Sequence, residues 1–437
     1  MRALVSFLLL MVFALPAMAG VKVQEITSPG GIKAWLVEDH SIPFAALDLR
    51  FRGGTSLDAP GKRGAVNLMT GLLEEGAGDL DAQAYARKLE GLAASFDFGA
   101  DPDTVSISAQ FLTENRDQAM DLLRQTLLAP RFDPAAIERV RAQVLSGLRS
   151  DAKNPNAIAG EGFRKLAYGD QPYGSDGSGT EDSVGDLTRD DLIAAHAAVF
   201  ARDRMYISVV GDITPEALGQ MLDTLLGELP ETGAPLPEAA KVTITGGTTV
   251  IPFETPQSVA IFGQPGIKRD DPDFFAAYIL NTILGGGSFE SRLMKEVRVK
   301  RGLTYGVYSY LVPRDLAAVY MGNVASSNDK IAEAVQVIRD VWADTQAHGV
   351  TEKELEDAKT YLTGAYPLRF DGNEQIASIL VGMQMDALPI DYIATRNDKI
   401  NAVMLEDVNR VAASLLKPDQ LHFVVVGTPE GLESSTN

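Results

Sequence analysis

Cysteine is absent from this chain of 437 residues. Its absence excludes disulfide bonds, thiolate metal sites and cysteine nucleophiles. Histidine is scarce, and no two of the four, His40, His196, His348 and His422, are close in sequence. The chain therefore has no local histidine-rich zinc motif. It also lacks a G-x-S-x-G segment, and no histidine has a motif partner, which excludes a serine triad of the usual kind.

Basic residues are in the minority: 39 lysines and arginines stand against 59 aspartates and glutamates, a formal net charge of −20. Such a surface repels phosphate backbones, so we expect no nucleic-acid binding, and any charge preference should favour basic peptides. With 45% hydrophobic and 22% charged residues, the composition excludes a disordered, collagen-like or multi-span membrane protein. The length predicts at least two domains of roughly 200 residues each.

Long apolar runs are also missing, apart from one at the start of the chain. Met1-Arg2 precedes an apolar run from Leu4 to Leu15, and Ala17-Met18-Ala19 matches a small-x-small cleavage site. This pattern predicts a signal peptide over residues 1–19 and a periplasmic or secreted protein, with a bacterial periplasm favoured. A membrane anchor is the alternative, but the run is short for a span of about 20 residues. We expect no membrane span after cleavage, which would remove Arg2 and leave a charge of −21.

Strand and helix patterns alternate through the first half of the mature chain. Period-two or continuous apolar runs predict strands, and apolar residues at helical spacing predict helices. Asp133-Pro134 is a helix start signal, an N-cap residue followed by proline at the first helical position. The predicted strands are 33–38, 45–51, 104–111 and 205–210, and the predicted helices are 62–73, 82–92, 115–128 and 134–150.

A proline-rich segment separates two similar halves. Residues 229–240 contain the run LPETGAPLP and are predicted to be a linker between an N-terminal domain (20–228) and a C-terminal domain (241–437). The same order of residues recurs after it at an offset of 211 to 216, with Leu68 matching Leu280 and Val209-Val210-Gly211 matching Val425-Val426-Gly427. The predicted fold class is α+β, with two homologous domains, each a mainly antiparallel sheet covered by helices.

Several segments together resemble the pitrilysin/insulinase family of metallopeptidases that carry an inverted zinc motif. The resemblance is to its short two-domain branch, which includes the mitochondrial processing peptidase subunits and bacterial periplasmic homologues. It implies two roll-like domains that, paired with a second such pair, enclose a chamber for unfolded peptides. The segments that carry it are Gly53–Asp58, Gln171–Gly174 with Gly179–Ser183, Val209–Asp212, Leu284–Ser288, Ser291–Leu293 and Arg301–Tyr305.

The zinc-binding residues of that family are missing here. The family carries H-x-x-E-H on its first long helix and a distal glutamate on a later helix. Asn67, Thr70 and Gly71 stand at the three motif positions, and Ser146 and Gly147 stand where the distal acid is expected. None of these side chains is an imidazole or carboxylate ligand, and none has a useful pKa for a general base. We therefore expect no metal or other cofactor in this chain, and zinc in a partner chain.

The second half keeps another feature of the family. Arg298 and Tyr305 stand seven residues apart, as do an arginine and a tyrosine that in the family contact the substrate carbonyl and the developing oxyanion. A guanidinium and a phenol suit that role as hydrogen-bond donors. Spacing alone favours a packing role, whereas the resemblance favours the functional one. Arg301 is the closest competitor, although it lies only four residues from Tyr305.

These observations lead to one main hypothesis and two alternatives. The chain is predicted to be the non-catalytic subunit of a periplasmic zinc metalloendopeptidase heterodimer. Its partners would be a homologous sister subunit with an intact H-x-x-E-H motif and extended peptide substrates. The first alternative is a non-enzymatic peptide-binding or assembly protein, and the second is a metallopeptidase with unorthodox ligands. The Gly285–Gly287 segment is either a substrate-contacting loop or a turn that ends a helix.

Overall fold

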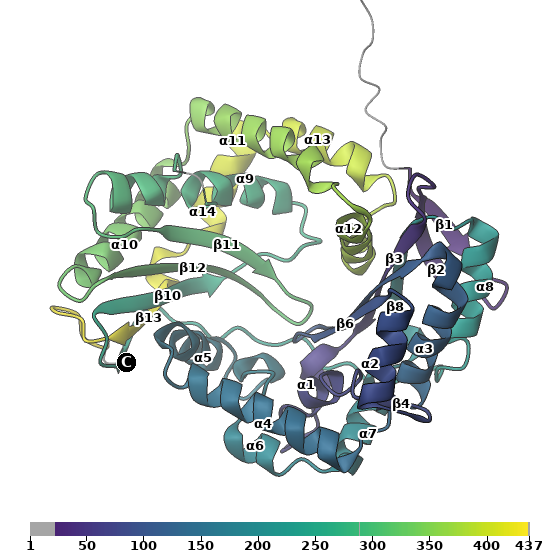
Figure 1. Cartoon of the computed structure of the whole chain (residues 1–437). Helices are drawn as coiled ribbons and strands as arrows, with labels where there is room; N and C mark the ends of the chain where they lie inside the picture. The colour runs from purple at the N-terminus through teal and green to yellow at the C-terminus, as the bar shows by residue number, and fades with distance from the viewer. Residues whose placement is uncertain (1–21, 288, 436–437) are drawn as a thin grey trace, which may run out of the picture.

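The computed structural model describes residues 22–287 and 289–435, so the predicted signal peptide lies outside the described residues. The chain forms two sheets in sequence order, one in each half, and helices cover both of them (Figure 1). This arrangement confirms the α+β prediction. Within the described ranges, no helix is long and apolar enough to cross a membrane.

The first sheet has the strand order β1-β2-β8-β3-β7-β6. All neighbouring strands are antiparallel except β2 and β8, which are parallel. Its strands are β1 (Gln24–Thr27), β2 (Lys33–Glu38), β3 (Phe44–Arg52), β6 (Ser95–Ala100), β7 (Thr104–Leu112) and β8 (Met205–Gly211), and β4 (Gly76–Ala77) and β5 (Leu80–Asp81) form a small hairpin. The helices of this half are α1 (Ala65–Thr70), α2 (Ala82–Gly91), α3 (Arg116–Leu128), α4 (Pro134–Asp151), α5 (Pro155–Tyr168), α6 (Glu181–Gly185), α7 (Arg189–Val199) and α8 (Pro215–Leu226).

The second sheet repeats the first. Its order β9-β13-β10-β12-β11 matches β2-β8-β3-β7-β6, and its one parallel pair, β9 with β13, occupies the place of β2 with β8. Its strands are β9 (Gly247–Pro252), β10 (Gln257–Pro265), β11 (Val307–Pro313), β12 (Ala318–Ser327) and β13 (His422–Gly427). The helices are α9 (Phe274–Leu284), α10 (Ile331–His348), α11 (Glu352–Ala365), α12 (Asn373–Met385), α13 (Tyr392–Ala402) and α14 (Leu405–Leu415).

The residue matches of the internal repeat hold in space. Leu68 on α1 and Leu280 on α9 are both fully buried, each in the core of its own half. Val210 and Val426 occupy equivalent places near the ends of β8 and β13. A sequence period of about 212 residues therefore reflects two copies of one supersecondary unit.

Each half lends one helix to the sheet of the other half (Figure 1). Helix α12 packs its Ala377 and Leu380 against Trp35 and Val210 of the first sheet. In return, α5 of the first half packs against the second sheet, where Phe163 and Ala167 meet Val319 and Val424. Burial of these apolar side chains joins the two halves through two hydrophobic clusters that neither half forms alone.

The connection between the halves has no regular secondary structure from residue 230 to residue 246. It contains the predicted linker 229–240 and lies against the protein, since Ala240 N–H donates to Leu316 O at 2.8 Å and Thr243 N–H donates to Ala167 O at 2.8 Å. The exact domain boundaries, 20–228 and 241–437, stay a prediction.

The predicted start of one helix was wrong and that of another was right. The helix predicted over 62–73 is only α1 (Ala65–Thr70), because Gly64 before it adopts a positive φ of 96°. Its start is capped from a distance: the Asp58 carboxylate accepts from Gly64 N at 2.9 Å and Val66 N at 2.8 Å. The start of α4 is as predicted, with Asp133 at the N-cap position and Pro134 as the first helical residue, although the Asp133 carboxylate accepts from Arg131 Nε at 2.7 Å and not from a backbone N–H of the helix.

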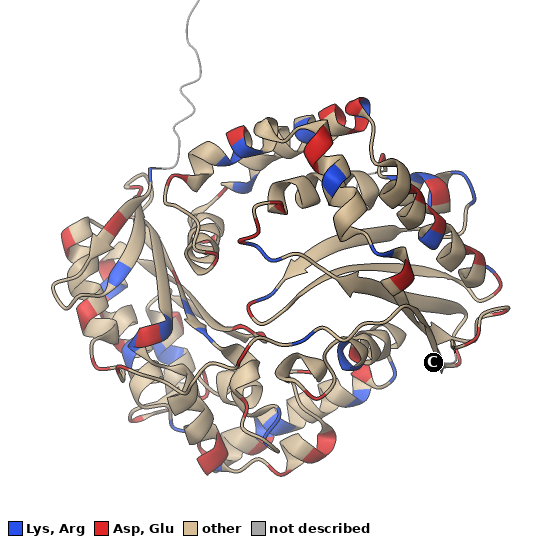
Figure 2. Ribbon diagram, turned by 180° about the vertical axis from the view of Figure 1, so that it is seen from behind, with Lys and Arg blue, Asp and Glu red and all other residues tan. Residues whose placement is uncertain are grey.

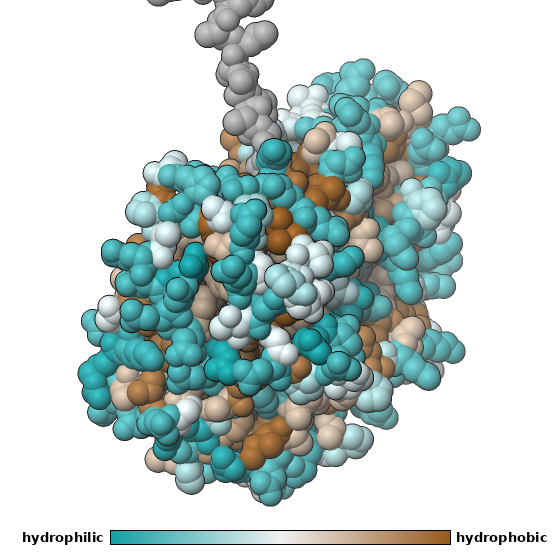
Figure 3. Space-filling model, turned by 90° about the vertical axis from the view of Figure 1, so that its right-hand side faces the viewer, coloured by the Kyte–Doolittle hydropathy of each residue, from teal (hydrophilic) through white to brown (hydrophobic). Residues whose placement is uncertain are grey.

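Charge is distributed unevenly between the two sheets. No strand of the second sheet contains a lysine, arginine, aspartate or glutamate, whereas β3 of the first sheet carries Asp48, Arg50 and Arg52. Acidic and basic residues lie mainly on the outer helices and loops (Figure 2). Seen from the side of the first half, the surface is mainly hydrophilic, with apolar residues in separated groups (Figure 3).

Candidate functional site

The positions of the lost zinc motif lie on and just after α1. Thr70 is 3% exposed, and its Oγ1 donates to Val66 O of its own helix at 2.8 Å. Its hydroxyl is thus engaged with the backbone and does not point to a shared metal position. Gly71 follows at the C-cap, and Asn67 is partly buried one turn before it.

The positions expected to supply the distal acid lie on α4, the helix that packs against α1. Ser146 and Gly147 are both exposed, and a Cβ on Gly147 would meet open space. Over the described ranges, no group of three or more histidine, aspartate or glutamate side chains is placed to hold a metal ion. The side chains at these positions offer only an amide and two hydroxyls, and the two glycines offer no side-chain ligand, so the residues present do not fit a zinc ion.

Arg298 lies on a π-helical turn, η5 (Met294–Val299), in the second half. Such turns are rare and occur often at functional sites. Its guanidinium lies over the exposed ring of Phe289, 4.6 Å from the centroid, and it has no ion pair or hydrogen bond to any other side chain that the structure describes. Arg301, its competitor, is already paired: its Nη1 bonds Glu296 Oε2 at 2.7 Å.

Tyr305 follows η5 on a turn that folds back against it. Gly302 N–H donates to Arg298 O at 2.9 Å, and the Thr304 hydroxyl donates to Ala325 O at 2.6 Å, which fixes the backbone on both sides of the turn. The side chain of Tyr305 is nevertheless 84% exposed. The structure therefore places Arg298 and Tyr305 on one hydrogen-bonded segment, with Arg298 half-buried and stacked on Phe289 and the Tyr305 side chain exposed. Their role in catalysis stays a prediction.

The glycine-rich segment ends α9. Gly285 N–H donates to Asn281 O at 2.9 Å, and Gly287 adopts a positive φ of 89°. A Cβ on Gly285 would lie 2.8 Å from Ser309 N, so glycine is needed where this turn passes β11. These contacts explain Gly285 and Gly287 as parts of a helix-terminating turn, whether or not the segment also touches a substrate.

Tyr173, in the Gln171–Gly174 segment, connects the two halves. Its hydroxyl donates to the Asp103 carboxylate and accepts from Leu316 N at 2.9 Å. Burial raises the pKa of Asp103, and the hydrogen bond from Tyr173 and the charge of Arg314 lower it. Tyr173 is 2% exposed, so this family-like residue has a structural role in the present chain.

Each half of the chain matches a known family model. Residues 33–181 match the model described as insulinase (peptidase family M16), and residues 186–362 match the model described as the peptidase M16 inactive domain. A solved structure from Pseudomonas fluorescens, described as a peptidase M16 inactive domain, is 31% identical and has a TM-score of 0.87 over 95% of this chain and 100% of that one. The chain belongs to peptidase family M16.

Two M16 relatives differ in their described activity. A protein of Helicobacter pylori named as the non-peptidase homolog YmxG is 28% identical, over 89% of this chain and 90% of its own length. The beta subunit of the mitochondrial-processing peptidase of Neurospora crassa is 23% identical, over 94% of this chain and 89% of its own length. The M16 fold alone therefore does not decide whether a member cleaves peptides.

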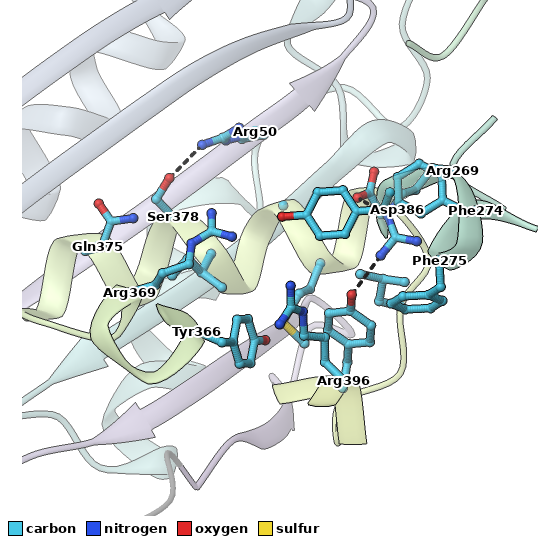
Figure 4. Close-up of a pocket in the computed structure, with 16 residues that line it drawn as sticks. Arg50, Arg269, Phe274, Phe275, Tyr366, Arg369, Gln375, Ser378, Asp386 and Arg396 are labelled. Atoms are coloured by element: carbon cyan, nitrogen blue, oxygen red, sulfur yellow. Dashed lines mark hydrogen bonds and ion pairs between the residues drawn. The ribbon is translucent and has the colours of Figure 1, made fainter. Parts of the chain in front are cut away.

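One feature of this M16 chain was missed by the sequence predictions. Four arginines that are far apart in sequence, Arg50, Arg269, Arg369 and Arg396, line one cavity between the halves (Figure 4). They come from β3, the loop before α9, the end of a 3₁₀ turn (Tyr366–Arg369) and α13. No local motif joins them, and only the packing of α12 onto the first sheet brings Arg50 near the other three.

Proposed function

We propose that this chain is the non-catalytic subunit of a periplasmic zinc metalloendopeptidase heterodimer. The observation that carries the proposal is a contrast within one chain. The zinc positions Asn67, Thr70 and Gly71 provide no zinc ligand. Arg298, which stacks on Phe289, and the exposed Tyr305 form no ion pair or side-chain hydrogen bond with another described residue. Hydrogen-bond donors in a chain that lacks zinc ligands suit an active site whose zinc is bound by another chain.

The chemistry assigned to the pair is electrostatic. The Arg298 guanidinium is a permanent cation with several donors, and the Tyr305 phenol is a neutral donor. Placed beside a scissile carbonyl, both would form stronger hydrogen bonds to the oxyanion of the transition state than to the ground state. The sister chain would supply zinc, its bound water and the general base, and this chain would supply half of the peptide chamber.

Other observations support an inactive member of the family. The second half matches a model described as an inactive domain, and one relative is named as a non-peptidase homolog. The predicted signal peptide supports the periplasmic location.

The direct test is reconstitution with a homologous chain that carries H-x-x-E-H. We expect the two chains to co-purify, each alone to leave an unfolded peptide intact, and the mixture to cleave it. Cleavage by the zinc-binding chain at the same rate without this chain would contradict the proposal. The matched control is the mixture with a zinc-ligand variant of the sister chain, which should be inactive.

A non-enzymatic peptide-binding protein is the second candidate, favoured by one observation. Among the described strands, β6 (Ser95–Ala100) pairs only with β7, so its outer edge can accept an added peptide strand through backbone hydrogen bonds. The net charge of −20 predicts that basic peptides bind more tightly than acidic ones and that added salt weakens their binding. Binding of a labelled basic peptide by this chain, with no activity in any mixture, would favour this candidate over the subunit role.

A further inference from the structure

A cavity of about 400 Å³ lies where α12 passes between the first sheet and the second half. Arg50 of β3 forms one wall, and its Nη2 donates to Ser378 of α12 at 3.0 Å. The opposite walls come from α9, α13 and the 3₁₀ turn at Tyr366–Arg369 (Figure 4). Arg369 and Gln375 at the edge are exposed, so the cavity is open to solvent there.

The charge of this cavity is opposite to that of the molecule. Four arginines line it, against the single carboxylate of Asp386. That carboxylate lies 3.5 Å from Arg269 Nε, and Arg50 has Asp48 at 3.2 Å. Arg369 and Arg396 have no carboxylate within 4.0 Å in the part of the chain that the structure describes. Although the chain carries a net charge of −20, the lining of this cavity has more arginines than carboxylates.

Arg396 is the most deeply buried arginine of this cavity. It is only 5% exposed, and its Nη1 donates to Leu362 O at 2.8 Å and Asn397 Oδ1 at 3.0 Å, both neutral acceptors. The ring of Tyr366 lies under it, 4.4 Å from the centroid. Burial of a cation is costly unless an anion accompanies it, and a bound anion would supply that partner.

The remaining walls indicate what the anion is attached to. Phe274, Tyr278, Tyr366, Ile379 and Met383 line the same cavity between the arginines. Aromatic and aliphatic walls favour an apolar group, and arginine forks favour a planar carboxylate. We propose that this cavity binds a carboxylate joined to an aromatic or large aliphatic group.

Two sources share that chemistry: the C-terminal residue of a peptide, or a free small organic acid. A second cavity of about 230 Å³ shares Arg50, Gln375 and Ser378 with the first and runs along Ser95 and Asp97 of the edge strand β6. A peptide would therefore have space for the residues before its terminus. The proposal does not depend on the subunit role, because it concerns binding by this chain alone.

The test is calorimetric titration of the mature chain with matched probes. N-acetyl-phenylalanine and its C-terminal amide differ only in the carboxylate, and so do a neutral peptide ending in free phenylalanine and its amidated form. We expect the acids to bind at least about tenfold more tightly than the amides, as loss of a charge-assisted bond implies. Tighter binding of the peptide acid than of N-acetyl-phenylalanine identifies a peptide terminus as the source, and the reverse order identifies a small acid.

Variants separate the cavity from the general surface. Arg369→Gln removes an exposed guanidinium that has no ion pair among the described residues, so the fold should persist, and acid binding should weaken about tenfold. Arg87→Gln, on the exposed face of α2 and outside the cavity, is the matched control and should bind like the unchanged chain. Equal binding of acid and amide, or unchanged acid binding by Arg369→Gln, would overturn the proposal.

Discussion

Gly71 on the exit of α1 packs so closely against Val140 of α4 that a Cβ at residue 71 would lie 3.3 Å from Val140 Cγ1. Most natural Cβ contacts are longer, so a larger residue here requires the Val140 side chain to shift by a few tenths of an ångström. The second histidine position of the lost motif is therefore filled by a residue whose small size the helix pairing now uses.

This packing predicts the result of an attempt to restore the metal. The unchanged chain should carry no stoichiometric zinc, as measured by elemental analysis. The double variant Asn67→His with Gly71→His should not hydrolyse peptides, because Thr70, Ser146 and Gly147 still supply no base or distal carboxylate. It should also lose about 1–3 kcal/mol of stability through overpacking against Val140. One tightly bound zinc per unchanged chain would contradict this prediction.

The hydroxyl of Tyr173 should contribute to the attachment of the two halves. Tyr173→Phe removes the donor to Asp103 and the acceptor for Leu316 N–H, and leaves both groups partly buried without that partner. We expect the free energy of unfolding to fall by about 1–3 kcal/mol in denaturant titrations. Tyr305→Phe deletes the same hydroxyl from a side chain that is 84% exposed and should change stability by less than about 0.5 kcal/mol. Equal effects of the two variants would contradict the structural assignment of Tyr173.

His196 should make stability depend on pH in the acidic range. Burial between Phe132 and Phe200 lowers its pKa to about 4, from an ordinary value of 6.5. In the unfolded chain His196 therefore becomes protonated as the pH falls below 6.5, whereas in the folded chain it stays neutral down to about pH 4. The free energy of unfolding contributed by this group is complete above pH 6.5 and falls as pH drops through that window, by about 3 kcal/mol at most.

The measurement is the difference in unfolding free energy between the unchanged chain and His196→Phe at several pH values. Other acidic groups titrate in both proteins and cancel in this difference. The difference should change between pH 6.5 and 4 and stay constant above pH 7. A constant difference throughout would mean that His196 titrates normally in the folded chain.

The sequence predicted much of the fold, for identifiable physical reasons. The strands around Ala45–Phe51 and Thr104–Phe111 were predicted within one residue at each end. Thr104–Phe111 alternates because only one face of β7 is buried, whereas Ala45–Leu49 is buried without a break and has the run of apolar residues typical of a strand covered on both faces. The repeat was visible because both cores use the same buried positions. The start of α1 was misplaced, because its capping carboxylate, Asp58, lies outside the usual N-cap position.

The candidate sites were predictable only where they are local. Arg298 and Tyr305 lie seven residues apart in one segment, so the family resemblance could select them, although their spacing alone favours a packing role. The cavity with Arg50 and Arg396 forms because α12 of the second half packs against the first sheet. The periodicity of a single segment cannot predict such a contact between distant segments. The partner of Tyr173 was equally hidden, since Leu316 is 143 residues away.

The most direct test of the subunit role is steady-state kinetics of the reconstituted heterodimer with Tyr305→Phe. Loss of one oxyanion donor typically lowers kcat about 10²–10³-fold, and zinc content and assembly should stay unchanged. Arg298→Ala should lower kcat and also raise KM, if its cation holds the ground-state carbonyl. Lys300→Ala breaks only an exposed ion pair with Glu296, 2.5 Å long, and should have little effect. Full activity from both Tyr305→Phe and Arg298→Ala would contradict the account, and would leave this chain a structural or peptide-binding role.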